Sequence, residues 1–324
     1  MHAWLCEQPT GVQALRWQEL PTPEPAAGQV RIRIHAASLN FPDLLTVQNK
    51  YQIKPPLPFV PGSEFSGVVE AVGDGVRDLS VGDRVASIGV TGGFASHACV
   101  GADNVMPLPP GFELDDAAAF AFTYGTSHHA LIDRAALQPG ETVLVLGAAG
   151  GVGSAAVQIA KAAGAHVIAA ASSDVKCAFC KTLGADSTIN TGREDLRDAL
   201  RAATAGGGVD VVYDPVGGDL SEAAFRSMAW RGRYLVVGFA AGPIPALPWN
   251  LALLKGASVV GVFWGDFVRR EPKAFYAGMA ALFDWYAQGK IKPAIDARLP
   301  MADLALAYDR MASRQVCGKL LLMN

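Results

Sequence analysis

The strongest indication of the fold is the stretch Thr142-Val143-Leu144-Val145-Leu146-Gly147-Ala148-Ala149-Gly150-Gly151-Val152-Gly153. Its first five residues form a continuous apolar run, which is typical of a strand buried on both faces of a parallel sheet. Its last six residues occupy the positions of the dinucleotide fingerprint G-x-G-x-x-G, with alanine at the first glycine position. Small residues at 154–163 predict a helix. A strand, a glycine-rich turn and a helix in this order predict a nucleotide-binding Rossmann domain.

The glycines of this turn have separate expected uses. Gly150 lets the backbone approach a pyrophosphate, and Gly153 lets the helix pack closely on the strand. The helix that follows presents free N–H groups to phosphates. The alternative is a tight turn with only a structural role, but the strand and helix around it favour cofactor binding.

Apolar runs continue the pattern on the C-terminal side of the turn. Further strands are predicted at 166–171, 209–214, 233–238 and 258–263. Strands that alternate with helices imply a doubly wound parallel sheet. A helix is expected around 272–288, and the final apolar run at 319–322 predicts a strand that returns to the first domain.

The first 120 residues have a different texture, rich in glycine, proline and short β-prone runs. Val30–Ile34 alternates apolar and polar residues, as a half-buried strand does. Further short runs lie at 65–72 and 81–85, and frequent turns between short strands favour an irregular β-barrel-like domain. Asp115 and Asp116 predict a helix start. The expected division is 122–264 for the Rossmann domain, and 1–121 with 265–324 for the other.

Composition excludes several classes of protein. The chain has 324 residues and a formal net charge of −3, so it forms no basic field for nucleic acid or an anionic membrane. No apolar run approaches the roughly 20 residues of a spanning helix, and the N-terminus lacks signal-peptide features. A cytoplasmic protein is therefore expected. Its five cysteines are expected to be free thiols: Cys6, Cys99, Cys177, Cys180 and Cys317.

The end of the second Rossmann strand bears on the choice of cofactor. An NAD site usually has Asp or Glu about 20 residues after the turn, bonded to the ribose 2′-OH. Here the strand ends at Ala171-Ser172-Ser173, with Asp174 two positions late and Lys176 beyond. Hydroxyls and a lysine suit a 2′-phosphate, so NADPH is favoured. Ser173 or Asp174 can also simply cap the next helix, and both roles can coexist.

Several motifs together resemble the medium-chain dehydrogenase/reductase superfamily. The turn at 147–161 and Leu183-Gly184-Ala185-Asp186 are similar to that superfamily. Asn40-Phe41-Pro42-Asp43, the run Pro61–Val69, Tyr213–Gly218 and Gly318-Lys319 resemble its zinc-free NADPH:quinone oxidoreductase (zeta-crystallin-like) branch. The resemblance covers essentially the whole chain. It implies a Rossmann domain joined to a GroES-like catalytic domain.

The resemblance also implies site residues. Tyr51 and Asn40 would be catalytic and line the substrate pocket near the nicotinamide. Residues implied to bind the cofactor are Asn40, Thr126, His129, Ala149, Gly150, Gly151, Val152, Ser172, Ser173, Lys176, Val216, Gly238, Phe239, Phe263, Trp264 and Lys319. The sequence departs from the family pattern at Val47 and Asn49, where Arg and Gly are common, so the loop before Tyr51 is expected to differ. Thr191 replaces an aromatic residue near the adenine site.

No zinc is expected. The zinc branch has a Cys near position 40 and a Gly-His-Glu motif, whereas this chain has Asn40 and Gly62-Ser63-Glu64. Asparagine and serine are poor zinc ligands. Cys177-x-x-Cys180 falls on a predicted helix with no second pair nearby, so it is interpreted as free structural or surface thiols rather than a metal or redox pair.

The resemblance implies an enzyme of the NADPH:quinone oxidoreductase type (EC 1.6.5) that transfers hydride to quinones or related α,β-unsaturated carbonyls. Tyr51 would be the proton donor or carbonyl partner. The alternatives are a 2-enoyl thioester reductase of the acryloyl-CoA or enoyl-ACP type, a zinc alcohol dehydrogenase, and a cofactor-binding protein with a structural or sensing role. The apolar strand at 258–263 can pair across a two-fold axis, so a homodimer is expected.

Overall fold

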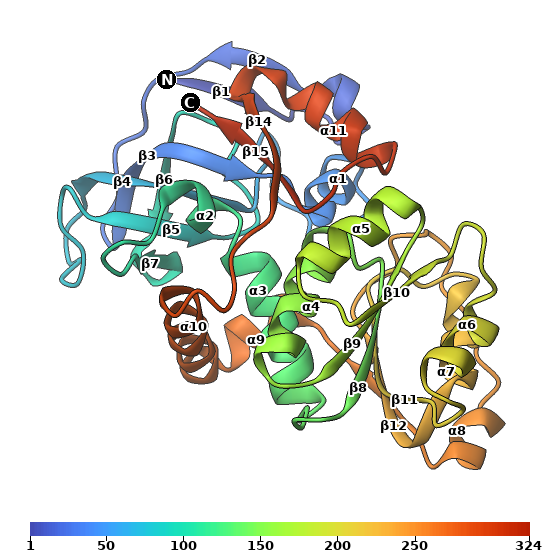
Figure 1. Cartoon of the computed structure of the whole chain (residues 1–324). Helices are drawn as coiled ribbons and strands as arrows, with labels where there is room; N and C mark the ends of the chain where they lie inside the picture. Colours follow the sequence, from blue (N-terminus) through green and yellow to red (C-terminus); the bar gives the residue numbers. More distant parts are fainter. The chain divides into compact units, whose positions relative to one another are not determined.

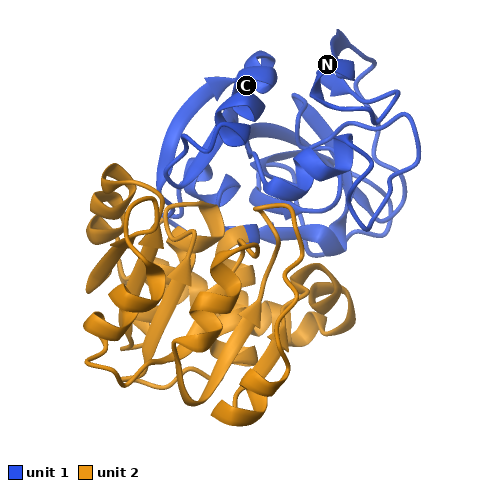
Figure 2. Ribbon diagram, turned by 90° about the vertical axis from the view of Figure 1, so that its right-hand side faces the viewer, with its two compact units in different colours: residues 1–122, 293–324 blue, residues 123–292 orange.

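The computed structural model describes residues 1–324, which form two compact units (Figure 2). Unit 1 comprises residues 1–122 and 293–324, and unit 2 comprises residues 123–292. Each unit has a hydrophobic core of its own, built mainly from the apolar residues of its own sheet.

Unit 2 is built on a six-stranded parallel sheet. Its strand order is β10-β9-β8-β11-β12-β13 (Figure 1). The strands are β8 (Thr142–Leu146), β9 (His166–Ala171), β10 (Ser187–Asn190), β11 (Val209–Asp214), β12 (Met228–Val236) and β13 (Ser258–Gly261). All residues of β8 and β9 except the first of each are buried, which explains why apolar residues predict these strands within a residue. This order is that of a doubly wound dinucleotide-binding fold, as predicted.

Helices connect and cover these strands. They are α3 (Ala121–His128), which begins in unit 1, a π-helical segment (His129–Arg134), α4 (Gly151–Ala162), α5 (Asp174–Thr182), α6 (Leu196–Ala203), α7 (Leu220–Arg226), α8 (Asn250–Lys255), α9 (Trp264–Arg270) and α10 (Pro272–Ala287). None of the helices in the chain combines the length and the apolar character needed to cross a bilayer.

Unit 1 contains a seven-stranded sheet, in which six strands follow the order β14-β15-β3-β4-β5-β7 and β6 pairs with β3. The strands are β3 (Gln29–Ser38), β4 (Glu64–Val72), β5 (Arg84–Ile88), β6 (His97–Gly101), β7 (Val105–Pro107), β14 (Ile295–Pro300) and β15 (Lys319–Met323), and a small sheet joins β1 (His2–Leu5) to β2 (Arg16–Glu19). Helices α1 (Phe41–Val47), α2 (Leu114–Ala118) and α11 (Leu304–Ala312) and three 3-10 turns (Val12–Ala14, Ala102–Asn104 and Met301–Asp303) complete the unit.

The final strand returns to the first unit, as predicted. In β15, Leu321 and Leu322 pair antiparallel with Ser38 and Ala37 of β3. This pairing brings residues near position 319 beside residues near position 40, and the candidate site depends on this proximity.

The expected second domain boundary at 264/265 differs from the division in the structure, which lies at 292/293. The reason is that α9 and α10 pack within unit 2. Trp264 stands against Gly125, whose added Cβ would lie 2.8 Å from the indole. His129 stacks on Phe267 with ring centroids 3.9 Å apart. The apolar pattern of these helices predicts that one face of each is buried, but it does not predict which of the two hydrophobic cores that face packs against.

Candidate functional site

The glycine-rich turn joins β8 to α4 in unit 2. Gly147 has φ 59°, a left-handed conformation that favours glycine. An added Cβ at Gly153 would lie 2.3 Å from the Gly147 carbonyl oxygen, so only glycine lets α4 start this close to the strand. Gly150 is the N-cap of α4, and the first intrahelical bond runs from Ser154 N–H to the Gly150 carbonyl.

The N-terminus of α4 is therefore open to an anion. The N–H groups of Gly151, Val152 and Gly153 precede the first intrahelical bond and have no acceptor within the helix. A helix N-terminus of this kind suits a pyrophosphate. The Val152 carbonyl accepts a hydrogen bond from Ser127 Oγ at 2.9 Å, which fixes the first turn on the side of α3.

At the carboxyl end of β9, Ser173 caps α5: its hydroxyl accepts the Lys176 N–H at 3.3 Å. The Asp174 carboxylate is held by Arg193 at 2.9 Å and by the Asn190 amide at 2.9 Å. The turn that carries Arg193 is bound to the strand end, because Thr191 N–H donates to the Ala171 carbonyl. Two cationic residues, Lys176 and Arg193, therefore lie at this end of β9 together with the Asp174 carboxylate, which already has hydrogen-bond partners.

Asp214, at the carboxyl end of β11, organises the loop that contains Val216. One carboxylate oxygen accepts the N–H groups of Val216 and Gly217, both at 2.8 Å. The other accepts the hydroxyls of Ser221 at 3.1 Å and Tyr234 at 2.5 Å. This buried carboxylate fixes the loop beside the glycine turn, where the Val216 side chain would contact a Cβ added at Gly147.

Further residues that the resemblance implied are distributed through unit 2. Thr126 and Trp264 are buried, and Phe263 is half exposed. His129 is buried, with Nδ1 2.7 Å from Asp133 Oδ2, and burial lowers the pKa of its ring. Gly238 and Phe239 follow β12, and the Phe239 ring would contact a Cβ added at Gly217.

Unit 1 contains a buried polar cluster around Asn40, which we call the Asn40 cluster: Ser38, Asn40, Glu64 and Lys319. Lys319 Nζ donates to Asn40 Oδ1 at 2.6 Å and to the Leu39 carbonyl at 3.1 Å. It also lies 3.5 Å from Glu64 Oε2. The same Glu64 oxygen accepts Ser38 Oγ at 2.7 Å and Asn40 Nδ2 at 3.1 Å.

The charged groups of the Asn40 cluster are paired with one another. Glu64 is fully buried, and its second oxygen accepts the Phe122 N–H at 2.7 Å. Burial lowers the pKa of Lys319, while the carboxylates of Glu64 and Asp43 oppose that shift. The three protons of the ammonium have three acceptors, so a direct bond from Lys319 to a cofactor would require an exchange of partner.

The geometry fixes the orientation of the Asn40 amide. Its oxygen accepts from Lys319, and one amide hydrogen goes to Glu64. An amide NH₂ has two hydrogens, so one donor remains for a ligand.

Asp43 and Tyr51 lie next to this cluster. The Asp43 carboxylate accepts the Asn40 backbone N–H at 2.8 Å at the start of α1. Burial raises the pKa of Asp43 to about 7, against the opposing effects of the Asn40 N–H, the Ser63 hydroxyl and Lys319. Burial and the neighbouring Asp43 carboxylate raise the pKa of Tyr51, so its phenol is protonated at neutral pH.

Comparison with known proteins identifies the family. A family model described as zinc-binding dehydrogenase matches residues 151–284, and one described as alcohol dehydrogenase GroES-like domain matches residues 26–110. The chain is 39% identical over 303 residues to a quinone oxidoreductase-like protein 2 of Bos taurus, covering 93% of this chain and 87% of the relative. The chain belongs to the medium-chain dehydrogenase/reductase superfamily. The expected fold class and the resemblance to the quinone oxidoreductase branch are confirmed.

Solved structures agree with this membership. The chain is similar to a mycobacterial protein in complex with NADPH, with 32% identity, a TM-score of 0.92 and complete coverage of both chains. It is also similar to the Escherichia coli quinone oxidoreductase in complex with NADPH, with 29% identity, a TM-score of 0.91 and complete coverage of both chains. The protein is thus an oxidoreductase of this superfamily.

Two features of the site escaped the sequence analysis. Arg193 lies far along the chain from Ser172, and only the pairing of Thr191 with Ala171 reveals that it reaches the end of β9. The Asn40 cluster combines the N-cap of α1 with residues of β3, β4 and β15, so no single local motif predicts it. Gly318-Lys319 was recognised only as part of the resemblance.

All five cysteines are thiols, and none of them forms a disulfide. Cys177 and Cys180 are both buried residues of α5. No group of three His, Cys, Asp or Glu side chains converges as a metal site would require.

Proposed function

We propose that this protein reduces quinones or related α,β-unsaturated carbonyl compounds with NADPH and without zinc. The observation that carries the proposal is the Asn40 cluster, in which the Lys319 ammonium lies against Asn40 and Glu64. A quinone takes up one hydride and one proton for each two-electron reduction. When bound, NADPH supplies the hydride.

The nucleotide fits the residues of unit 2. The open N–H groups of Gly151, Val152 and Gly153 would hold the pyrophosphate. Ser172, Lys176 and Arg193 would hold the 2′-phosphate, because the Asp174 carboxylate at this strand end is already paired with Arg193, and the nearby Glu194 carboxylate accepts the Asn190 N–H. The complexes of the mycobacterial and Escherichia coli relatives with NADPH support this choice.

Unit 1 would supply the polar groups for the acceptor. The free amide hydrogen of Asn40 can orient a carbonyl, and the protonated Tyr51 phenol can donate a proton as charge develops on the acceptor oxygen. Quinones need little acid catalysis, whereas an enone depends more on a proton donor such as Tyr51. A zinc ion would have to displace the Lys319 ammonium from Glu64 and Asn40, which supports zinc independence.

We also propose that the protein forms a homodimer through β13. β13 is an edge strand of the sheet, and Val259 on it is exposed. Large apolar side chains are also exposed nearby at Trp230, Leu253 and Leu254. A second copy of the chain that adds its own β13 would continue the sheet and cover this surface. Light scattering of the purified protein tests the dimer.

An acceptor panel tests the proposed reaction. NADPH oxidation would be followed with 1,4-benzoquinone, a simple enone such as methyl vinyl ketone, and crotonyl-CoA, with and without prior treatment with a zinc chelator. The proposal predicts turnover of the quinone or the enone that the chelator leaves unchanged. Turnover of crotonyl-CoA alone would instead assign a 2-enoyl thioester reductase. Tight NADPH binding without turnover would indicate a sensing or structural role.

A further inference from the structure

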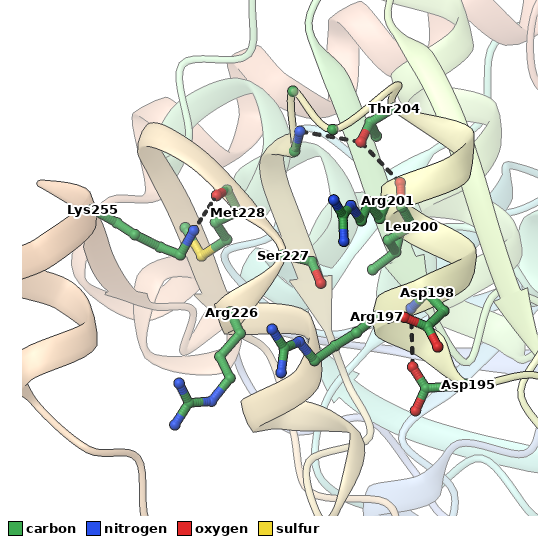
Figure 3. Close-up of a pocket in the computed structure, with 13 residues that line it drawn as sticks. Asp195, Arg197, Asp198, Leu200, Arg201, Thr204, Arg226, Ser227, Met228 and Lys255 are labelled. Atoms are coloured by element: carbon green, nitrogen blue, oxygen red, sulfur yellow. Dashed lines mark hydrogen bonds between the residues drawn. The ribbon is translucent and has the colours of Figure 1, made fainter.

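A cavity lies on unit 2, away from the glycine turn. It has a volume of about 590 Å³ and is lined by α6, the turn that follows it, and the ends of α7 and α8 (Figure 3). Thr204–Gly208 precede β11 and Ser227 precedes β12, so the cavity opens at the amino edge of the parallel sheet. The glycine turn follows β8 at the opposite, carboxyl edge. The two sites are therefore separated by the length of the strands.

Four cationic side chains line this cavity: Arg197, Arg201, Arg226 and Lys255. In Figure 3 the guanidinium groups of Arg197 and Arg201 extend from α6 toward the side on which Arg226 and Lys255 lie. Arg226 pairs with Glu222 at 2.6 Å, and Lys255 Nζ donates to the Met228 carbonyl at 2.6 Å. Arg197 and Arg201 have no ion pair or hydrogen bond from their side chains.

Part of this charge has an ordinary explanation. Arg201, Arg226 and Lys255 occupy the last turns of α6, α7 and α8, where a cation complements the helix dipole. Arg197 does not fit this explanation. It is the second residue of α6, in the turn where the dipole disfavours a cation, and it stands four residues before Arg201, another cation.

The crowding of cations also affects Lys255. Burial lowers the pKa of Lys255, and the positive charge of Arg197 lowers it further. The free protein therefore holds Arg197 where the dipole, Arg201 and Lys255 all oppose its charge. An anion bound between α6 and α8 would relieve each of these repulsions.

The remaining polar groups indicate what else the ligand carries. Asp195 and Asp198 also line the cavity. One Asp195 oxygen accepts the Asp198 N–H at 2.9 Å as the cap of α6, and the carboxylates keep further acceptor positions. Carboxylates would repel a bare polyanion but accept hydrogen bonds from hydroxyl groups. Two hydrogen bonds hold the turn, since Thr204 Oγ donates to the Leu200 carbonyl at 2.8 Å and accepts the Gly208 N–H at 3.1 Å.

We infer that this cavity is a second binding site, which takes a phosphorylated, hydroxyl-bearing small molecule such as a sugar phosphate or a nucleoside phosphate. Arg197 and Arg201 bind the phosphate, since guanidinium groups match its geometry in a bidentate fashion. Asp195 and Asp198 accept the hydroxyls. The volume lies within the range of roughly 300–1,000 Å³ that is typical of small-molecule sites.

The test measures binding by calorimetry at constant ionic strength, with saturating NADPH present so that the cofactor site is filled. The probes are ribose 5-phosphate, ADP, inorganic pyrophosphate and sulfate. The site predicts that ribose 5-phosphate or ADP binds and that sulfate does not compete at equal concentration. Which of the two binds more tightly distinguishes a sugar phosphate from a nucleotide.

Matched charge-neutralising variants locate the binding. Arg197→Gln is expected to weaken the affinity at least about tenfold, the effect of losing a charge-assisted hydrogen bond. The control is Arg77→Gln, which removes an exposed arginine of unit 1. Equal affinities of the two variants would overturn the site, as would binding of sulfate as tight as that of the organic phosphates, which would indicate an adventitious ion only. Because the readout is binding, it does not depend on the proposed reaction.

Discussion

Lys319 Nζ lies 2.6 Å from Asn40 Oδ1, although the two residues are 279 positions apart in the chain. The contact exists because β15 pairs with β3, and it is completed by the Glu64 carboxylate. Asn40 thereby loses the freedom to flip its amide, and it presents one N–H rather than its carbonyl oxygen.

Lys319→Met is expected to destabilise the protein by about 3–5 kcal/mol, because it leaves the buried Glu64 carboxylate without its cation. Urea denaturation measures the loss. The matched control is Lys319→Met combined with Glu64→Gln, which removes both charges and should recover a substantial part of the stability. Additive losses in the double variant would show that the two groups are not coupled.

Asp43→Asn tests the raised pKa of the buried carboxyl. The folded-state pKa of about 7 lies above the ordinary value of 3.8, so the folded protein binds the proton more tightly than the unfolded chain. The stability contributed by the protonated form is therefore present at low pH and is lost as pH rises between about 4 and 7.

The asparagine side chain still accepts the Asn40 N–H but does not titrate. We expect Asp43→Asn to gain stability relative to the wild type as pH rises from 5 to 7.5, measured by urea denaturation. The exposed variant Asp74→Asn serves as a control without this trend. A pH-independent difference between Asp43→Asn and the wild type would contradict the raised pKa.

Gly153→Ala places a methyl group 2.3 Å from the Gly147 carbonyl and 2.8 Å from the Ala148 Cα. The helix must shift, so we expect a loss of roughly 1–3 kcal/mol in stability and weaker NADPH binding by fluorescence titration. Gly261→Ala is the control, since its Cβ meets nothing within 4 Å. If both variants bound NADPH equally well, the close approach of α4 would not matter for the cofactor.

Arg193→Ala tests the assignment of the 2′-phosphate site. Its guanidinium, 2.9 Å from Asp174 at the end of β9, should contact the 2′-phosphate of NADPH, which NADH lacks. We therefore expect the Kd for NADPH to rise about tenfold while that for NADH changes little. Equal losses for both nucleotides would indicate a structural role for Arg193.

Tyr51→Phe removes the proposed proton donor and keeps the ring. An oriented general acid contributes about 10²–10⁴-fold, so kcat for an enone should fall by a factor in this range, and kcat for a quinone by less. The KM for NADPH should stay constant. Unchanged rates with both acceptors would eliminate the role of Tyr51.

β8, β9 and β11 were predictable because each is a largely buried apolar run. The four-residue β10, Ser187–Asn190, was not predicted from the sequence, and β13 was predicted as an apolar run although it is mostly exposed. The boundary between the two units at 292/293 was not predictable. The buried face of α10, with Phe275, Met279 and Leu282, does not specify which hydrophobic core it packs against. At the site, Gly150, Gly153 and Ser173 follow from local rules. The Asn40 cluster and the position of Arg193 depend on contacts between segments that are distant in the sequence. Periodicity and motif spacing do not predict such contacts.

We propose that the protein reduces an electron-poor carbonyl acceptor with NADPH. The most direct measurement is kcat/KM for 1,4-benzoquinone with NADPH and with NADH in parallel, on protein freed of metal. We expect acceptor-dependent oxidation that is at least about tenfold more efficient with NADPH, since NADH lacks the phosphate that Lys176 and Arg193 are proposed to bind. Equal or greater efficiency with NADH, or no turnover until zinc is restored, would contradict it.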